Sequence, residues 1–268
     1  LQSLGLFAGG ALGGALVKWA GAPGLFAVTT ALTALWLVLT YAIFAGLTVS
    51  SKKPSLKNGI SGGWLLAVVA TQSVSVITSL LTPHAEQPIR LTMDFLALTT
   101  WLWGGMLYIW LMALIFYRYS FLPLAPEDLS PSYWINMGAM AISTLAGTLL
   151  LTNSQGAPFL SSMTPFIKGF TLFYWAAGTW WIPLQLILSV WRYVLRRSRI
   201  AYEPIYWGVV FPLGMYAAST DHLVHALELQ FLDKLPPVFL GIALIAWIFT
   251  AIGLTHRLIR QLRGRTYS

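Results

Sequence analysis

Asp221, His222 and His225 form the one cluster in this sequence whose residue types and spacing suggest metal chemistry. Histidines three residues apart share a helix face, and a pair of them can hold a metal ion or a haem. A metal site needs three or four converging ligands, and no second group of ligands accompanies this one. We therefore interpret the cluster as polar residues at a membrane interface and predict no metal, no cofactor and no catalytic residue. The absence of cysteine excludes disulfides, thiolate metal sites and cysteine nucleophiles.

Two isolated charges also need an explanation. Asp94 lies one turn into an apolar stretch. Acidic side chains are favoured at helix N-termini, so we interpret Asp94 as a partner of the helix dipole rather than as a proton relay. Lys168 lies near the start of another apolar stretch, where its side chain can snorkel to the interface. Attraction of anions is the alternative role for Lys168.

The elements that position these residues are long apolar segments. The chain is 57% hydrophobic and 9% charged, whereas soluble domains carry about 25% charged residues. Only helices or closed barrels span a bilayer, and a helical span needs roughly 20 apolar residues. Eight stretches qualify, and none alternates as a barrel strand would. They lie near residues 3–19, 23–48, 62–82, 92–117, 132–152, 160–191, 204–226 and 236–259. We predict an all-α membrane protein with one transmembrane domain, 1–268.

The basic residues lie mostly on one side of these predicted spans. Twelve of the 16 lysines and arginines follow even-numbered spans: Lys52, Lys53, Lys57, Arg118, Arg192, Arg196, Arg197, Arg199, Arg257, Arg260, Arg263 and Arg265. The positive-inside rule places these loops and the C-terminus in the cytoplasm. The net charge of +8 therefore sets topology, and we predict no nucleic-acid partner.

The spans alternate in character. Spans three, five and seven begin about seventy residues apart, and such a period indicates repeated units. Odd-numbered spans hold small and polar residues and even-numbered ones are bulky, so we expect the odd spans inside. Small residues at Gly9/Gly13 and Gly10/Gly14 are also typical of simple helix packing. The candidate pore-lining residues are Thr71, Gln72, Ser75, Asn136, Ser143 and Ser219.

No predicted inner span has an acidic residue in its middle. Cation channels and proton-coupled carriers usually place carboxylates along the path. A neutral path with basic mouths instead tolerates anions, because a basic rim raises their local concentration.

Pro212 and Gly214 interrupt the apolar stretch VVFPLGMYAAST at 209–220. Proline costs roughly 3 kcal/mol and glycine about 1 kcal/mol relative to alanine inside a helix. Irregular backbone at membrane depth is tolerated where it is buried in protein or lines a cavity. A kink at Pro212 re-aims Phe211, whose ring either fills a narrow pore or packs between helices. The residues alone leave both interpretations open.

Several long motifs resemble the tellurite-resistance/C4-dicarboxylate transporter family, which includes fungal malic-acid permeases and the slow anion channels of plant guard cells. They are FPLGMYAAST, YWINMGAMAIST, GGMLYIWLMALIFYRYSFLPLAPEDL and TWWIPLQLIL. The resemblance covers essentially the whole chain, and the motifs occur in the family's order.

The resemblance implies ten helices, arranged as five hairpins in a quasi-fivefold ring around a central pore. The eight spans then match helices three to ten, with the first hairpin absent. It also implies that Phe211, before Pro212, occludes the pore, and that the protein forms a homotrimer. Two predicted pore spans, 62–82 and 132–152, lack an internal proline, and glycines such as Gly138 are the alternative source of a bend.

The expected function is that of an inner-membrane anion channel or transporter, not an enzyme. The substrates implied are C4-dicarboxylates such as malate, chloride, nitrate or tellurite-type anions. A proton-coupled dicarboxylate or tellurite exporter is the alternative within this class. A membrane enzyme or haem protein built on His222 and His225, and a purely structural membrane subunit, are the alternatives outside it.

Overall fold

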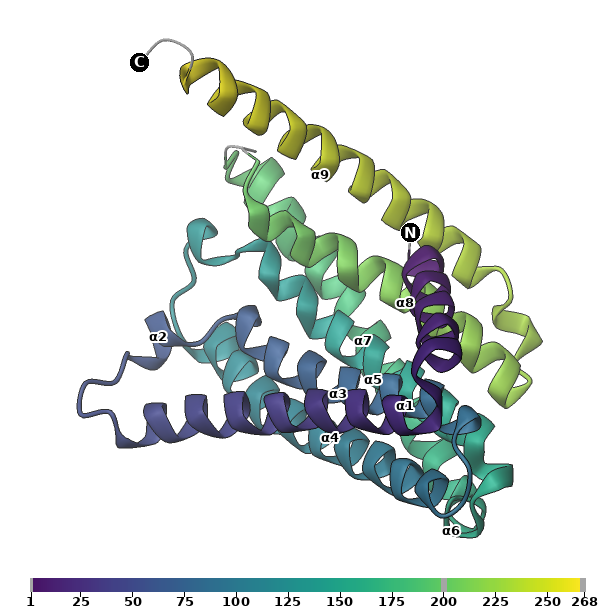
Figure 1. The fold of residues 1–268 in the computed structure, drawn as a ribbon. Coiled ribbons are helices and arrows are strands. Elements are labelled where there is room, and N and C mark those ends of the chain that lie inside the picture. The colour runs from purple at the N-terminus through teal and green to yellow at the C-terminus, as the bar shows by residue number, and fades with distance from the viewer. Residues whose placement is uncertain (1, 199–201, 266–268) are drawn as a thin grey trace.

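The structure, a computed structural model, describes residues 2–198 and 202–265, which contain helices and no strand (Figure 1). Only the backbone is described for 2–23, 25, 26 and 263–265, so the predicted packing of Gly9 and Gly13 lies outside the described side chains. The predicted all-α fold is confirmed. The longer helices are α1 (Gln2–Val49), α3 (Leu66–Leu81), α4 (Ile89–Phe121), α5 (Ile135–Asn153), α7 (Thr164–Val190), α8 (Trp207–Leu227) and α9 (Leu235–Arg265).

Three consecutive hairpins repeat the same order of elements. Each pairs a shorter helix with a longer one, namely α3 with α4, α5 with α7, and α8 with α9. A 3-10 turn that contains or directly precedes a tryptophan opens each hairpin: η1 (Gly62–Leu65), η4 (Pro131–Trp134) and η7 (Pro204–Tyr206). A second 3-10 turn follows each shorter helix: η2 (Thr82–His84), η5 (Ser154–Gly156) and η8 (Gln230–Leu232). This spacing matches the predicted period of about seventy residues.

Three short elements complete the chain. They are the one-turn helices α2 (Leu56–Gly59) and α6 (Pro158–Ser162), and the 3-10 turn η3 (Pro126–Asp128). A π-helical turn, η6 (Trp191–Leu195), extends α7. All three hairpins start and finish at the end of the bundle that carries Arg118 and Arg192, which we call the basic end.

Helix α5 occupies the centre. It contacts α3 on one side, α8 on the other, and its own partner α7. Of its most apolar segment 94% is buried, against 11% for that of α9. The predicted division into inner and outer helices therefore holds for α5 and α9. It is weaker in the first hairpin, where the apolar segment of α4 is 56% buried and that of α3 is 61% buried, because α4 also packs on α5.

The first two predicted spans, 3–19 and 23–48, fall within the single helix α1 of 48 residues. The expected loop between them is therefore wrong. Figure 1 shows that the first part of α1 stands at a steep angle to the rest, which runs along α3. Pro23 lies in this region of the chain, and proline is a common cause of helix kinks.

Five stretches of the described residues are long and apolar enough to cross a membrane by length and composition: Ala27–Val49, Gly62–His84, Ile89–Phe121, Pro131–Gly156 and Gln230–Leu262. Helices α7 and α8 do not reach the same hydropathy, because α7 carries three tryptophans, a lysine and a glutamine, and α8 carries an aspartate and two histidines. Their lengths of 27 and 21 residues still match a hydrocarbon core about 30 Å thick at about 1.5 Å per residue.

Candidate functional site

The six candidate pore-lining residues are all fully buried in the bundle. Thr71, Gln72, Ser75, Asn136, Ser143 and Ser219 each have 0% exposure. The structure brings them onto the three central helices α3, α5 and α8. Their hydrogen bonds differ from helix to helix.

On α3 the polar side chains bond to the neighbouring helices. The amide nitrogen of Gln72 donates to the Trp101 carbonyl of α4 at 3.0 Å, and Ser75 donates to the Ala97 carbonyl at 2.7 Å. Thr71 accepts from the indole N–H of Trp36 in α1 at 2.9 Å. Each bond joins two helices in an apolar medium, where few other partners are available.

Close packing around Gln72 depends on a glycine. A Cβ at Gly104 would lie 2.3 Å from the Gln72 amide nitrogen, so only glycine leaves room for this amide. The Gln72 amide oxygen has no hydrogen-bond partner. It is therefore an unused acceptor buried beside α4.

On α5 the polar side chains bond within the helix and to α4. Ser143 donates to the Ala139 carbonyl of its own helix at 2.7 Å. The Asn136 amide nitrogen lies 3.4 Å from the Tyr119 hydroxyl, whereas its amide oxygen has no partner. On α8, Ser219 donates to the Tyr216 carbonyl at 3.3 Å.

Gly138 and Pro212 approach closely where α5 packs against α8. Pro212 lies inside α8 and is buried, and a Cβ at Gly138 would lie 2.7 Å from its Cγ. The missing N–H of proline leaves the helix locally weaker, and the glycine lets the ring approach the α5 backbone. Gly138 thus has a packing role against Pro212.

Phe211 is half-buried and packs against the core. With Gly214 it lines a recess of about 50 Å³ between α8 and α9, whose other wall includes Leu240, Ala243 and Trp247. The ring therefore lies beside the outer helix of its own hairpin in this conformation.

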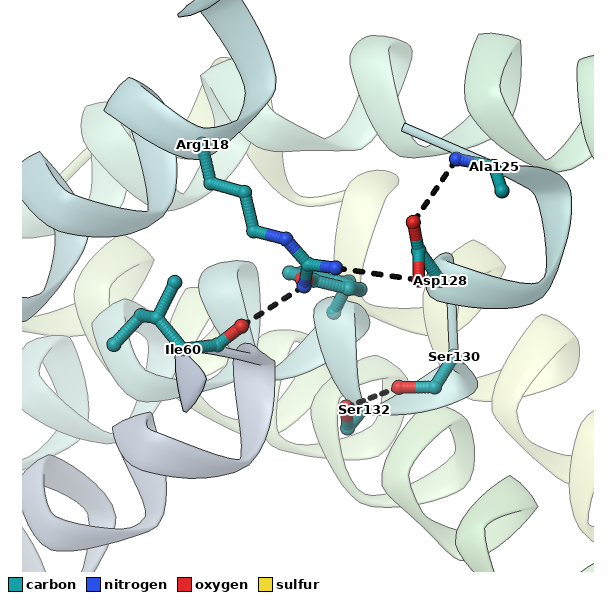
Figure 2. Close-up of polar contacts among 7 residues, drawn as sticks. Ile60, Arg118, Ala125, Asp128, Ser130 and Ser132 are labelled. Atoms are coloured by element: carbon teal, nitrogen blue, oxygen red, sulfur yellow. Dashed lines mark hydrogen bonds and ion pairs between the residues drawn. The ribbon is translucent and has the colours of Figure 1, made fainter. Parts of the chain in front are cut away.

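At the basic end, Arg118 joins three segments (Figure 2). It is 4% exposed, and its Nη1 donates to the Ile60 carbonyl at 2.8 Å and to the Tyr133 hydroxyl. Its Nη2 pairs with Asp128 at 3.5 Å. The other carboxylate oxygen of Asp128 accepts from the Ala125 N–H at 3.0 Å. Arg118 therefore ties the end of α4 to the turns that open the first and second hairpins.

From the sequence, Arg118 is identified only as a marker of topology. The available signal was the run RYSFLPLAPED, which places two acidic residues nine and ten positions after an arginine at the end of a span. Sequence alone does not reveal that the Ile60 carbonyl and Tyr133 complete the site, because Ile60 lies 58 residues from Arg118 and the chain turns twice before Tyr133.

At the opposite end, Asp94 is 0% exposed. The amide nitrogen of Asn153 lies 3.5 Å from one carboxylate oxygen, the other has no hydrogen-bond partner, and Arg90 is close enough to act on it electrostatically. The hydroxyl of Ser79 is buried nearby without a partner, and the Ser79 carbonyl accepts from Asn153 at 2.8 Å. Asp94 is thus an interhelical polar residue inside the bundle, and the sequence-based assignment to the helix N-terminus missed this burial.

The histidine cluster lies at the end of α8. His225 is exposed, and its Nδ1 lies 2.8 Å from the Asp221 carbonyl of its own helix. Within the part of the chain that the structure describes, no three His, Cys, Asp or Glu side chains are grouped to hold a metal ion.

Curated relatives are membrane proteins and transporters. A membrane protein of Mycobacterium tuberculosis strain H37Rv, named as uncharacterized, is 35% identical over 152 residues, or 57% of this chain and 77% of the relative. An uncharacterized transporter of Methanocaldococcus jannaschii is 28% identical over 203 residues, or 75% of this chain and 57% of the relative. A second one from that organism is 26% identical over 208 residues, covering 77% and 58%. The chain thus spans little more than half the length of these two transporters. No solved structure gives a significant match.

A family model covers nearly the whole chain. The model described as voltage-dependent anion channel matches residues 4–255, which include all three hairpins and the buried polar residues of α3, α5 and α8. Together with the transporter relatives, this match indicates a channel or transporter rather than an enzyme. The chain belongs to the voltage-dependent anion channel family.

Proposed function

We propose that this protein moves small anions across a membrane along a path between α3, α5 and α8. The observation that carries the proposal is the neutrality of these helices. They bury all six candidate hydroxyl and amide side chains, α3 and α5 contain no charged residue, and the one charge in α8, Asp221, lies near its end. Dipolar groups without fixed negative charge do not favour cations, and the basic end concentrates anions.

We propose Phe211 as the gate of this path. Its support is the neighbouring Pro212, which weakens α8 next to the ring, and the family resemblance of FPLGMYAAST. The recess beside Phe211 is about 50 Å³, smaller than the roughly 150 Å³ cavity that accommodates benzene in an engineered protein. The ring therefore needs a relative movement of α8 and α9 to leave its place.

The arrangement in the membrane belongs to the same proposal. The basic end with the C-terminus faces the cytoplasm by the positive-inside rule, and the membrane is the inner membrane. The three hairpins form part of a quasi-fivefold ring in the order of helices five to ten, and the protein assembles as a homotrimer. The substrates proposed are chloride, nitrate, malate and related dicarboxylates or tellurite-type anions.

The test is an anion flux assay on liposomes that contain the purified full chain. Chloride, nitrate, malate and succinate are compared under an imposed voltage, with protein-free liposomes as the control. Flux that follows the anion gradient and the voltage supports a channel. If none of the four anions moves faster than through protein-free liposomes, the proposal is wrong.

A proton-coupled exporter is the second candidate, and Asp94 favours it. A buried carboxylate with an unpaired oxygen is costly in a membrane protein and often marks a proton path. In a coupled exporter, Asp94→Asn removes the dependence of flux on a pH gradient. In a channel, flux is independent of the pH gradient before and after this change.

A further inference from the structure

A cavity of about 290 Å³ lies at the basic end, between the second and third hairpins. Its walls come from the end of α7 with the turn η6, the turns η4 and η7, the start of α8 and the middle of α9. The polar residues of the lining include Gln185, Arg192 and Tyr206, and the apolar residues include Leu188, Ala246 and Phe249. It is separate from the polar residues of the proposed path.

Two of these polar residues present hydrogen-bond donors without acceptors. The Nε and Nη1 atoms of Arg192 are buried and have no hydrogen-bond partner. The amide nitrogen of Gln185 is likewise buried without an acceptor in hydrogen-bond geometry, although Gln185 lies beside the Tyr119 hydroxyl. Both residues line the same cavity.

No carboxylate in the described part of the chain forms an ion pair with Arg192. Among the described residues the one ion pair of a lysine or arginine joins Arg118 to Asp128. Glu203 acts electrostatically on Tyr206, as Arg192 does, without pairing with Arg192. The guanidinium of Arg192 lies over the Tyr193 ring, 5.1 Å from the ring centroid. This contact uses the face of the guanidinium and leaves the N–H donors along its edge without acceptors. A desolvated arginine without an anion is costly.

The backbone holds Arg192 in an unusual position. It belongs to the π-helical turn η6, Trp191–Leu195, and such turns are often found at functional sites. The Arg196 N–H bonds to the Trp191 carbonyl at 2.9 Å in this turn. Arg196, four residues on, is exposed, so the turn directs one arginine into the protein and leaves the next outside.

The chemistry that satisfies these donors is an oxyanion. A guanidinium edge binds phosphate oxygens through two parallel hydrogen bonds. The wall that α9 contributes, with Ala246 and Phe249, is largely apolar and continues onto the outer surface, because Phe249 is 72% exposed. A free anion gains nothing from such a wall, whereas the acyl chain of a lipid does.

We propose that this cavity is a binding site for an anionic phospholipid. The phosphodiester accepts from Arg192 and Gln185, and an acyl chain lies along Leu188, Ala246 and Phe249 between α7 and α9. Basic pockets between transmembrane helices are known to bind anionic headgroups. The proposal does not depend on anion transport, because lipid binding is measured without flux.

The test measures lipid binding to the full chain in detergent by native mass spectrometry. Wild-type protein is titrated with phosphatidylglycerol, and with phosphatidylcholine in a parallel series. We expect bound phosphatidylglycerol to exceed bound phosphatidylcholine, and Arg192→Gln to lower phosphatidylglycerol affinity about tenfold or more, the effect of losing charge-assisted hydrogen bonds. Arg196→Gln removes the same charge from an exposed position and is the matched control, which we expect to change affinity less than twofold.

Two further measurements identify the source of the phosphate and guard against misfolding. An excess of inorganic phosphate displaces phosphatidylglycerol only if the site recognises the free ion. Displacement of the bound phosphatidylglycerol by inorganic phosphate would therefore overturn the lipid proposal. Ala246→Phe fills the cavity while Arg192 stays intact, and it should weaken phosphatidylglycerol binding even if Arg192→Gln does not fold. Equal loss in Arg196→Gln, equal binding of phosphatidylcholine, or unchanged binding in Ala246→Phe would each also overturn it.

Discussion

At the scale of single residues, buried polar groups fall into two kinds. Some, such as Ser75 and Arg118, have partners on neighbouring helices and hold the bundle together. Others, such as the Gln72 amide oxygen and one Asp94 carboxylate oxygen, have no partner. Unpaired groups are costly in an apolar medium, so they are where ligands or moving ions are expected.

Substitution of Phe211 tests whether its ring closes the path or only packs between helices. If its ring closes the path, Phe211→Ala raises anion flux per folded protein and Phe211→Leu is intermediate, while yield stays normal. If the ring only packs between α8 and α9, Phe211→Ala leaves a cavity that costs about 3–5 kcal/mol, and flux falls with yield. The measurement is liposome flux normalised to monodisperse protein. Normal yield with unchanged flux contradicts both roles.

Arg118 should matter more for stability than its partner Asp128. Arg118→Met removes hydrogen bonds from a buried guanidinium, and we expect a loss of about 1.5–3 kcal/mol in the free energy of unfolding. Asp128 has a side chain that is 31% exposed, so water screens the pair and Asp128→Asn should cost under about 1 kcal/mol. Thermal unfolding in detergent measures both, with Arg257→Gln on the exposed part of α9 as control. A larger loss in Asp128→Asn than in Arg118→Met would show that the ion pair, not the hydrogen bonds, stabilises this end.

At the scale of helices, glycines decide how closely the hairpins pack. Gly104 accommodates Gln72 of α3, Gly105 accommodates the Tyr174 hydroxyl of α7, and Gly138 accommodates Pro212 of α8. In a membrane, close contact supplies much of the association energy, because lipid removes the hydrophobic driving force between helices. Each hairpin is therefore joined to the next by a small residue opposite a larger one.

Gly138→Ala tests the joint between α5 and α8. The new Cβ would lie 2.7 Å from Pro212 Cγ and 3.1 Å from its Cα, so α8 must shift, and we expect a loss of about 1–3 kcal/mol in stability. Gly241→Ala in α9 is the matched control, because nothing lies within 4 Å of its added Cβ. That change should be neutral or stabilise the helix by up to about 1 kcal/mol. Equal thermal stability of the two variants would argue against close packing of Gly138 on Pro212.

At the scale of the whole molecule, the proposed path predicts which positions are accessible to water. In this cysteine-free background, Thr71→Cys and Ser143→Cys lie inside the bundle, whereas Leu35→Cys and Leu114→Cys lie on surfaces that are 56% and 43% exposed at those leucines. Facing lipid, the latter pair should react slowly with a charged thiol reagent. The inner pair should react faster, and faster still when combined with Phe211→Ala. Equal rates for both pairs would exclude the inner path.

Topology is a separate property of the whole chain. A reporter fused after Ser268 should behave as cytoplasmic, because α9 ends at the basic end of the bundle. A periplasmic reporter signal would reverse the proposed orientation. It would leave the fold and the lipid site unaffected, since neither depends on direction.

The sequence alone determined that the protein resides in a membrane, that it is helical and that its hairpins repeat. These follow from local quantities: the apolar content of each stretch, its length and the position of basic residues. It also identified the small and polar character of α3, α5 and α8, because a buried helix needs such residues to pack closely. The expected separate spans at 3–19 and 23–48 were wrong, since apolar composition continues through α1 and does not mark where a helix bends.

The tertiary structure decided which atoms meet. Gln72 bonds to the Trp101 carbonyl, Gly138 fits against Pro212, Asp94 is buried beside Asn153, and Arg118 reaches Ile60. Sequence could not show these pairs, because each joins segments that come together only when several helices pack at once. The same holds for Arg192 and Arg196, which are alike in the sequence. Only the turn of the backbone at the end of α7 separates the half-buried Arg192 from the exposed Arg196.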